Sequence, residues 1–266
     1  MQNKIPVFDI KIGDLEKKYI KDCLDSSSIG QGSYVKDFEK QFSQFVNCKF
    51  GVTTTSGTTA LHLALKTLDI GDGDEVLLSS STNMACAFSI AYCNAIPVPI
   101  DIEKDSWGIN PESIKSAITD KTKAIVMVHW AGQPCEIDQI NALAKQHGIK
   151  TIEDAAHAVR SKYKGSLIGS HSDYVCFSFQ AVKHLTTIDG GAIACKTFED
   201  AERARKLRWF GLDRNFKAPP GQPPASRWEQ DITEAGFKYH MNNINAAIGI
   251  AQMDYIDDLI TIHLGT

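Results

Sequence analysis

The residues best suited to covalent chemistry are a lysine and an acid that each follow a predicted strand. Lys183 has small and apolar neighbours in the segment CFSFQAVKHLTTIDGGA at 176–192. Asp154 ends an apolar strand pattern in the segment IEDAAH at 152–157. A lysine of this kind can form a Schiff base with pyridoxal phosphate (PLP), and an acid paired with the pyridine nitrogen makes the ring an electron sink. Together the two residues predict a PLP site, provided that its other parts are present.

A segment rich in hydroxyl groups, TTTSGTTALHLAL at 53–65, has the pattern of a strand that runs into a helix. The free N–H groups and the dipole of a helix N-terminus attract phosphate, and the hydroxyl of Thr58 or Thr59 can add donors. Simple N-capping by Ser56 or Thr58 explains the same residues equally well, so both interpretations stay open. The segment has neither P-loop nor GxGxxG spacing, which counts against nucleoside triphosphates and dinucleotides.

Several neighbours of the lysine and the acid fit the same site. Asp154 is expected at the carboxyl end of a strand, where α/β sheets bind ligands, and His157 could reach a ring oxygen. A helix cap followed by a hydrogen-bonded histidine is the competing interpretation of this pair. Ser178 could bind the same phosphate as the helix start, and the Gly-Gly pair at 190–191 allows a tight turn or a close backbone approach. Burial and nearby cations would lower the pKa of Lys183 and make its amine nucleophilic.

The elements that position these residues alternate between strand and helix patterns, which is typical of an α/β fold with a mostly parallel sheet sandwiched by helices. The predicted strands are 51–54, 75–79, 96–100, 124–129, 150–153, 173–177 and 191–195. The predicted helices are 14–25, 34–46, 58–68, 84–93, 111–117, 137–147 and 241–260. In the helix at 58–68, Leu61, Ala64, Leu65 and Leu68 share one face. The proline-rich segment 213–230 predicts a long loop of functional or mobile character.

Composition places the protein in an ordinary globular class. The 266 residues fit one large or two small domains, with 43% hydrophobic and 23% charged residues. A formal net charge of −4 argues against nucleic acid or an anionic membrane as the main partner. We expect neither a membrane span nor a signal peptide, because no apolar run is long enough. The seven scattered cysteines form no CxxC pair, which indicates buried, reduced thiols in a cytoplasmic protein rather than disulfides or a metal site.

In this order, the segments resemble those of the DegT/DnrJ-type sugar aminotransferases, a branch of the fold-type I PLP enzymes. The similarity covers almost the whole chain. Its main blocks are SGTTAL at 56–61, GDEV at 73–76, VHWAG at 128–132, EDAAH at 153–157, FSF at 177–179 and GFKYHM at 236–241. The resemblance implies the large domain of a fold-type I PLP-dependent transferase.

The resemblance also implies a role for each site residue. Lys183 corresponds to the Schiff-base lysine, which is also the general acid and base of the family. Asp154 corresponds to the residue that binds the pyridine nitrogen, and His157 to the residue beside the ring hydroxyl. The implied phosphate ligands are Gly57, Thr58 and Ser178. No metal is implied.

The reaction implied by the resemblance is transfer of an amino group from an amino acid, such as glutamate, to a nucleotide-linked keto sugar. Its products would be amino sugars for surface polysaccharide or related glycans. The family forms homodimers in which the partner subunit completes each active site. We expect residues 1–240, N-terminal helices included, to form the PLP-binding domain. Residues 241–266 would begin a helix that leads towards a C-terminal small domain, which the chain is expected to lack.

Three positions depart from the family pattern. Asn83 replaces an aromatic residue that often covers the cofactor ring, so stacking is weaker or comes from another residue such as Trp130. Lys238 replaces an asparagine that reaches the phosphate of the neighbouring subunit, and His240 replaces an arginine. Two alternatives stay open: a PLP-dependent sugar dehydratase of the same fold, and a catalytically silent truncated paralogue. Lys183 argues against the dehydratase, in which a histidine replaces the lysine.

Overall fold

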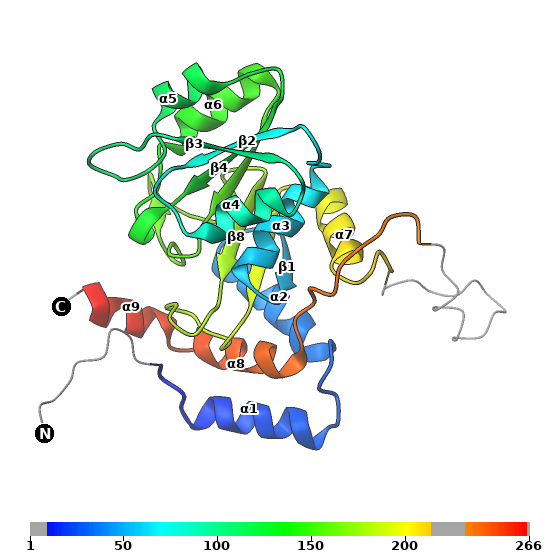
Figure 1. Cartoon of the computed structure of the whole chain (residues 1–266). Helices are drawn as coiled ribbons and strands as arrows, with labels where there is room; N and C mark the ends of the chain where they lie inside the picture. Colours follow the sequence, from blue (N-terminus) through cyan, green and yellow to red (C-terminus); the bar gives the residue numbers. More distant parts are fainter. Residues whose placement is uncertain (1–9, 214–231, 265–266) are drawn as a thin grey trace, which may run out of the picture.

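The centre of the protein is a seven-stranded sheet with the order β1-β9-β8-β5-β4-β2-β3 (Figure 1). This computed structural model describes residues 10–213 and 232–264. Neighbouring strands are parallel from β8 through β5, β4 and β2 to β3, whereas β9 runs antiparallel to both β8 and β1. The mostly parallel sheet is therefore confirmed. The strands are β1 Phe50–Thr54, β2 Glu75–Ser79, β3 Ile96–Ile100, β4 Thr122–Val128, β5 Lys150–Asp154, β8 Tyr174–Ser178 and β9 Gly191–Cys195.

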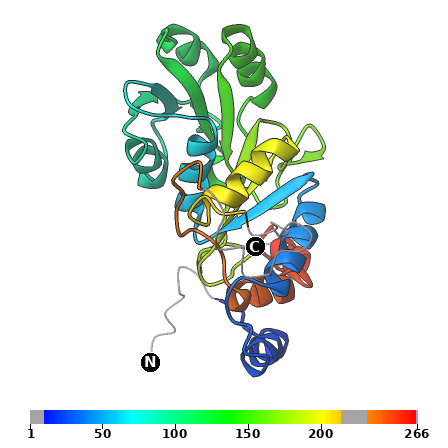
Figure 2. The same cartoon turned by 90° about the vertical axis from the view of Figure 1, so that its right-hand side faces the viewer.

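Helices lie on both sides of this sheet (Figure 2), which confirms the predicted sandwich. The helices α3, α4 and α7 contribute to one buried cluster, and α2, α5, α6 and α8 contribute to the cluster on the other face. The helices are α1 Asp14–Asp25, α2 Ser33–Phe45, α3 Gly57–Thr67, α4 Met84–Ala91, α5 Pro111–Ala117, α6 Ile137–His147, α7 Phe198–Leu207, α8 Asn243–Met253 and α9 Ile256–Leu264.

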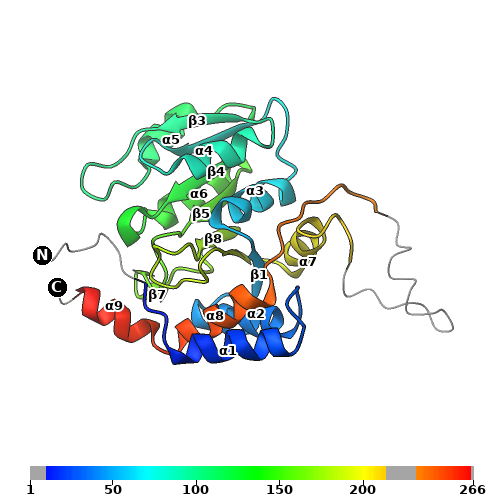
Figure 3. The same cartoon turned by 60° about the horizontal axis from the view of Figure 1, so that its bottom comes forward.

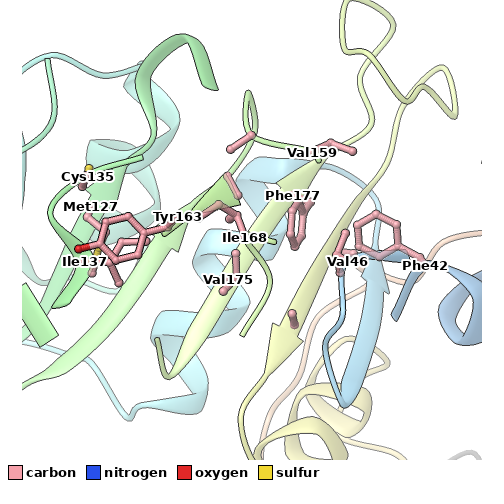
Figure 4. Packing of buried hydrophobic residues seen from close by; sticks show 14 of the residues in the cluster. Phe42, Val46, Met127, Cys135, Ile137, Val159, Tyr163, Ile168, Val175 and Phe177 are labelled. Carbon is pink, nitrogen blue, oxygen red and sulfur yellow. The ribbon is translucent and has the colours of Figure 1, made fainter. Parts of the chain in front are cut away.

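Strand β8 shows how the sheet separates the two cores. Because successive side chains of a strand point to opposite faces, Tyr174 and Cys176 pack with α3, α4 and α7, while Val175 and Phe177 pack on the other side. On that side the rings of Phe177 and Phe42 meet edge to face, with their centroids 5.1 Å apart (Figure 4). Burial on both faces fixes β8 and therefore the place where its carboxyl end presents side chains.

Helix α3 carries the apolar face that the sequence predicts. Leu61, Ala64 and Leu65 are buried, and Leu68, the last member of the predicted stripe, is the C-cap residue. The helix packs on β8 and β9. This packing places its N-terminus beside the end of β8.

The predicted single helix at 241–260 is wrong, because the chain forms α8 and α9 with a break at Asp254 and Tyr255. The hydroxyl of Tyr255 donates to the carbonyl oxygen of Lys11 at 3.2 Å and also contacts Glu16. These contacts with the N-terminal segment are made where the helix is interrupted. Helix α8 lies against α1 and α2 (Figure 3). The predicted domain division at residue 240 stays a prediction.

Two features were not predicted. Helix α7 begins after Thr197, whose hydroxyl accepts the N–H of Asp200 at 3.1 Å, so a capping signal was present in the sequence. The short strands β6 Lys162–Tyr163 and β7 Ser166–Leu167 form a hairpin. Lys164 and Gly165 connect them with positive φ angles of 48° and 85°, as tight hairpin turns require. From residue 214 on, the predicted loop lies outside the described residues.

Candidate active site

A cavity of about 400 Å³ opens where β4, β5 and β8 end and α3 begins. Parallel strands present their carboxyl ends at one edge of a sheet, and ligand sites of α/β folds lie there. The cavity brings together all the residues of the predicted site: Gly57, Thr58, Asp154, His157, Ser178 and Lys183. The other residues that line it include Asn83, Trp130, Gln180 and Asp189.

The start of α3 combines a side-chain cap with a close approach to β8. The hydroxyl of Ser56 accepts the N–H of Thr59 at 3.1 Å, and the N–H of Ser56 donates to the Thr59 hydroxyl at 3.0 Å. The capping interpretation is therefore correct for Ser56. A Cβ at Gly57 would lie only 2.8 Å from the Cβ of Ser178, so glycine allows the helix start to approach that strand end. The first-turn N–H groups of Gly57 and Thr58 stay available for a ligand.

Asp154 is the last residue of β5, and both of its carboxylate oxygens accept hydrogen bonds from protein groups. Oδ1 accepts the backbone N–H of Ala156 at 3.0 Å. Oδ2 accepts the thiol of Cys86 at 3.0 Å. The carboxylate is thus held from two sides while it still lines the cavity.

Burial and nearby charges shift the pKa values of Lys183 and His157, which both line the cavity. Burial lowers the pKa of Lys183, and the negative charge of Asp154 opposes this shift. Burial also lowers the pKa of His157, with a further decrease from the positive charge of Lys183. A lowered lysine pKa increases the fraction of neutral amine, which is the nucleophilic form.

The loop that carries Lys183 is anchored behind the cavity. The side-chain amide of Asn245 on α8 donates to the carbonyl oxygens of Thr187 at 2.6 Å and Asp189 at 2.9 Å. A Cβ at Gly191 would lie 2.4 Å from the carbonyl oxygen of Ser56, which confirms that the Gly-Gly pair allows a close backbone approach. The lysine loop is therefore tied both to α8 and to the start of α3.

The three residues that depart from the family pattern, Asn83, Lys238 and His240, all contact other groups of the chain. Asn83 is the N-cap of α4, and its Oδ1 accepts the N–H of Ala85 at 3.0 Å. The ring of Trp130 meets the ring of His157 edge-on at a centroid distance of 5.9 Å. Lys238 lies over the ring of Trp209 within the same chain, with Nζ 3.5 Å from the ring centroid. His240 also contacts Trp209, at 3.8 Å between ring centroids.

Sequence reasoning missed two buried groups at this site. Cys86 is one of the seven cysteines predicted to be buried, and it is buried, but its thiol also donates a hydrogen bond to Asp154. His129 and Glu153 form a fully buried pair with 2.8 Å between Nε2 and Oε2. The backbone N–H of Cys135 donates to Nδ1 of His129 at 3.2 Å, so Nε2 carries the proton and donates to the carboxylate. Both residues stand at the ends of predicted strands, but no local signal in the sequence specifies that their side chains meet.

Residues 10–213 and 232–264 contain no group of three or more His, Cys, Asp or Glu side chains that could hold a metal ion. Within the same ranges, every helix is too short or too polar to span a membrane.

Comparison with known proteins gives relatives along nearly the whole chain. The spore coat polysaccharide biosynthesis protein SpsC of Bacillus subtilis is 39% identical over 93% of this chain and 63% of its own length. GDP-perosamine synthase of Escherichia coli is 38% identical over 97% of this chain and 68% of its own length. The chain therefore spans about two thirds of the length of these curated relatives.

Solved structures also resemble this chain over nearly its whole length. Spr1654 of Streptococcus pneumoniae, in its PLP form, has a TM-score of 0.87 and 31% identity, with 96% of this chain and 67% of that chain covered. The sequence model of the DegT/DnrJ/EryC1/StrS aminotransferases matches residues 11–263. Because this match and the shared fold extend over almost all of the described residues, the chain belongs to the DegT/DnrJ/EryC1/StrS aminotransferase family, whose members use PLP.

Proposed function

We propose that this chain carries the active site of an aminotransferase that moves an amino group from an amino acid, such as glutamate, to a nucleotide-linked keto sugar. The observation that supports the proposal most is that Lys183 and Asp154 line one cavity, although Asp154 ends β5 and Lys183 lies in the loop after β8. The names of two relatives, GDP-perosamine synthase and a spore coat polysaccharide biosynthesis protein, support the class of substrate and a product used in polysaccharide.

We assign the contacts with the cofactor to residues that line this cavity. Lys183 holds PLP covalently, Asp154 pairs with the pyridine nitrogen, and His157 lies beside the ring hydroxyl. Gly57 and Thr58 at the start of α3 and Ser178 at the end of β8 would hold the phosphate. The exposed N–H groups and the dipole of a helix N-terminus suit an anion. When bound, PLP supplies an electron sink for the negative charge that develops on the substrate carbon.

In this proposal, Lys183 carries out the proton transfers. Because burial lowers the pKa of its amine, Nζ is neutral more often than the amine of an exposed lysine, and it can accept the α-proton of the amino donor. In the second half of the reaction, the same Nζ returns a proton as the amine passes to the sugar ketone. The carboxylate of Asp154 keeps the pyridine nitrogen protonated, because a negative charge nearby favours the cationic form.

We also propose that the protein acts as a homodimer. Met84, Phe88 and Tyr92 recur along one face of α4 and are 67%, 50% and 60% exposed. The helix begins after Asn83, which lines the cavity. A second copy that covers this apolar face would therefore border the active site, in agreement with shared active sites.

The proposal includes a cytoplasmic location and a domain division near residue 240. The seven cysteines are all free and six of them are buried, which suits the reducing conditions of a cytoplasm. Residues 1–240 form the PLP-binding domain in this proposal, and residues 241–266 lead towards a C-terminal small domain.

Reduction of the PLP-loaded protein with borohydride tests the covalent assignment. Borohydride converts a lysine–PLP bond into a stable amine, which peptide mapping locates. We expect the adduct on Lys183 and its loss in Lys183→Ala. The matched control, Lys162→Ala, changes a lysine of the β6–β7 hairpin and should leave the adduct in place. An adduct elsewhere, or none in the wild type, would contradict the assignment.

The substrate class needs a separate measurement. A thermal-shift panel of nucleotide sugars on the PLP-loaded protein would rank the ligands, because a ligand that binds the folded state raises its apparent stability. Amino transfer from glutamate to the best sugar should then be lost in Lys183→Ala and kept in Lys162→Ala. PLP binding without amino transfer from any donor would favour the catalytically silent alternative.

A further inference from the structure

A chain of two hydrogen bonds ends on the carboxylate that faces the active site. The hydroxyl of Thr82 donates to the sulfur of Cys86 at 3.1 Å, and the thiol of Cys86 donates to Oδ2 of Asp154 at 3.0 Å. Thr82 directly precedes the cap of α4, and Cys86 lies in its first turn. Helix α4 is thereby connected to the end of β5 through one sulfur atom.

The direction of these hydrogen bonds follows from the charges. Burial, and next the negative charge of Asp154, raise the pKa of the Cys86 thiol well above its ordinary value. The sulfur is therefore protonated and neutral, and only the S–H can lie between it and the carboxylate. The Thr82 hydroxyl supplies a donor to the sulfur, which polarises the S–H towards Asp154.

The S–H of Cys86 matters to the Asp154 carboxylate because the thiol lies in buried, apolar surroundings. Cys86 is fully buried in the apolar cluster of α3, α4, α7 and one face of the sheet. Among the described residues, the S–H of Cys86 is the donor to Oδ2, while the N–H of Ala156 serves Oδ1. A carboxylate oxygen without a donor is costly in apolar surroundings, and rotation of the side chain towards another donor reduces that cost.

We propose that Cys86 is a positioning residue, whose hydrogen bond to Oδ2 holds the Asp154 carboxylate oriented towards the pyridine nitrogen of PLP. The proposal rests on the role assigned to Asp154 above. A thiol is a weaker donor than a hydroxyl, so it orients the carboxylate while leaving most of the oxygen's acceptor strength for the cofactor. Loss of the thiol frees the Asp154 carboxylate to turn, and its hold on the pyridine nitrogen weakens.

Matched substitutions at Cys86 test the proposal through binding of PLP itself. A hydrogen bond to a charged group typically accounts for about tenfold or more in an equilibrium constant. We therefore expect Cys86→Ala to raise the dissociation constant of PLP about tenfold, and Cys86→Ser, which restores a donor, to stay within about threefold of the wild type. In the amino-donor half-reaction, Cys86→Ala should lower kcat with little change in KM.

Cys93 supplies the control, because it is also buried and belongs to the same cluster, and none of its described hydrogen bonds involves Asp154. Cys93→Ala should bind PLP as the wild type does. If Cys86→Ala also binds PLP as the wild type does, or if Cys86→Ala and Cys86→Ser weaken binding equally, Cys86 has only a packing role. Equal urea midpoints of the apo variants would show that a difference in PLP binding does not come from unfolding.

An infrared measurement tests the hydrogen bond without the cofactor. The S–H stretching band that disappears in Cys86→Ser should shift to higher frequency in Asp154→Asn, because a neutral amide oxygen accepts more weakly than a carboxylate. An unchanged band would overturn the proposal even if PLP binds. If the bond is present but the wild type fails to form an adduct at Lys183, the proposed function fails and, with it, the role given to Cys86.

Discussion

At the scale of single residues, the chemistry depends on the charge of one amine. Burial lowers the pKa of Lys183 from its ordinary value of 10.5, and the negative charge of Asp154 works in the opposite direction. His157, with its own pKa lowered by burial and by Lys183, is more often neutral than an exposed histidine. The lysine is thus prepared for attack on a carbonyl carbon by burial rather than by a neighbouring base.

This arrangement predicts a pH profile. The rate at which Lys183 forms its covalent bond with saturating PLP should rise with pH to a midpoint below 10.5, since the neutral amine is the reactive form. Asp154→Asn removes the charge that favours the protonated amine, so its midpoint should lie lower still. Stopped-flow absorbance between neutral pH and pH 10.5 would measure the midpoints of the wild type and of Asp154→Asn. A midpoint that moves upward in Asp154→Asn would contradict this account.

At the scale of elements, the site depends on how firmly the ends of β4 and β5 are held together. His129 follows β4, Glu153 lies on β5, and their side chains are hydrogen-bonded and fully buried. The backbone N–H of His129 also donates to the carbonyl oxygen of Asp154 at 3.1 Å. The pair therefore holds the strand ends from which Asp154 and Trp130 reach the cavity.

Two substitutions in this pair should differ strongly in their cost. His129→Phe leaves the carboxylate of Glu153 buried without its donor, so we expect a loss of about 3–5 kcal/mol in the free energy of unfolding. Glu153→Gln keeps an oxygen for the Nε2–H and removes a buried charge, so its cost should be about 1 kcal/mol or less. Urea unfolding of the two apo variants compares them. Equal losses would show that the hydrogen bond to Glu153 adds little.

At the scale of the whole molecule, the proposed homodimer depends on the exposed face of α4. The wild type should sediment at twice the chain mass of 29.3 kDa. Phe88→Asp places a charge in the middle of this face and should give monomers, since an unpaired charge is costly in an apolar interface. Phe198→Asp changes another exposed phenylalanine, on α7, and should leave the dimer intact. A monomeric wild type at micromolar concentration would contradict the proposal.

Much of the fold was predictable because its signals are local. The predicted ends of every strand of the sheet lie within two residues of the observed ends. The capping signal at Ser56 and Gly57 predicted the start of α3. The capping residue Thr197 could have predicted the start of α7 in the same way. The break before α9 could not be predicted from the local sequence, because Tyr255 is held by contacts with the distant N-terminal segment.

The sequence by itself determined the α/β class, the order of the elements and the residues that meet in the cavity, since periodicity, caps and strand ends are properties of short segments. Only the tertiary structure decided which buried groups support those residues. Cys86 lies 68 positions before Asp154, and His129 lies 24 before Glu153. Whether such side chains meet depends on how α4, β4 and β5 pack against one another, and no local pattern in the chain specifies that packing.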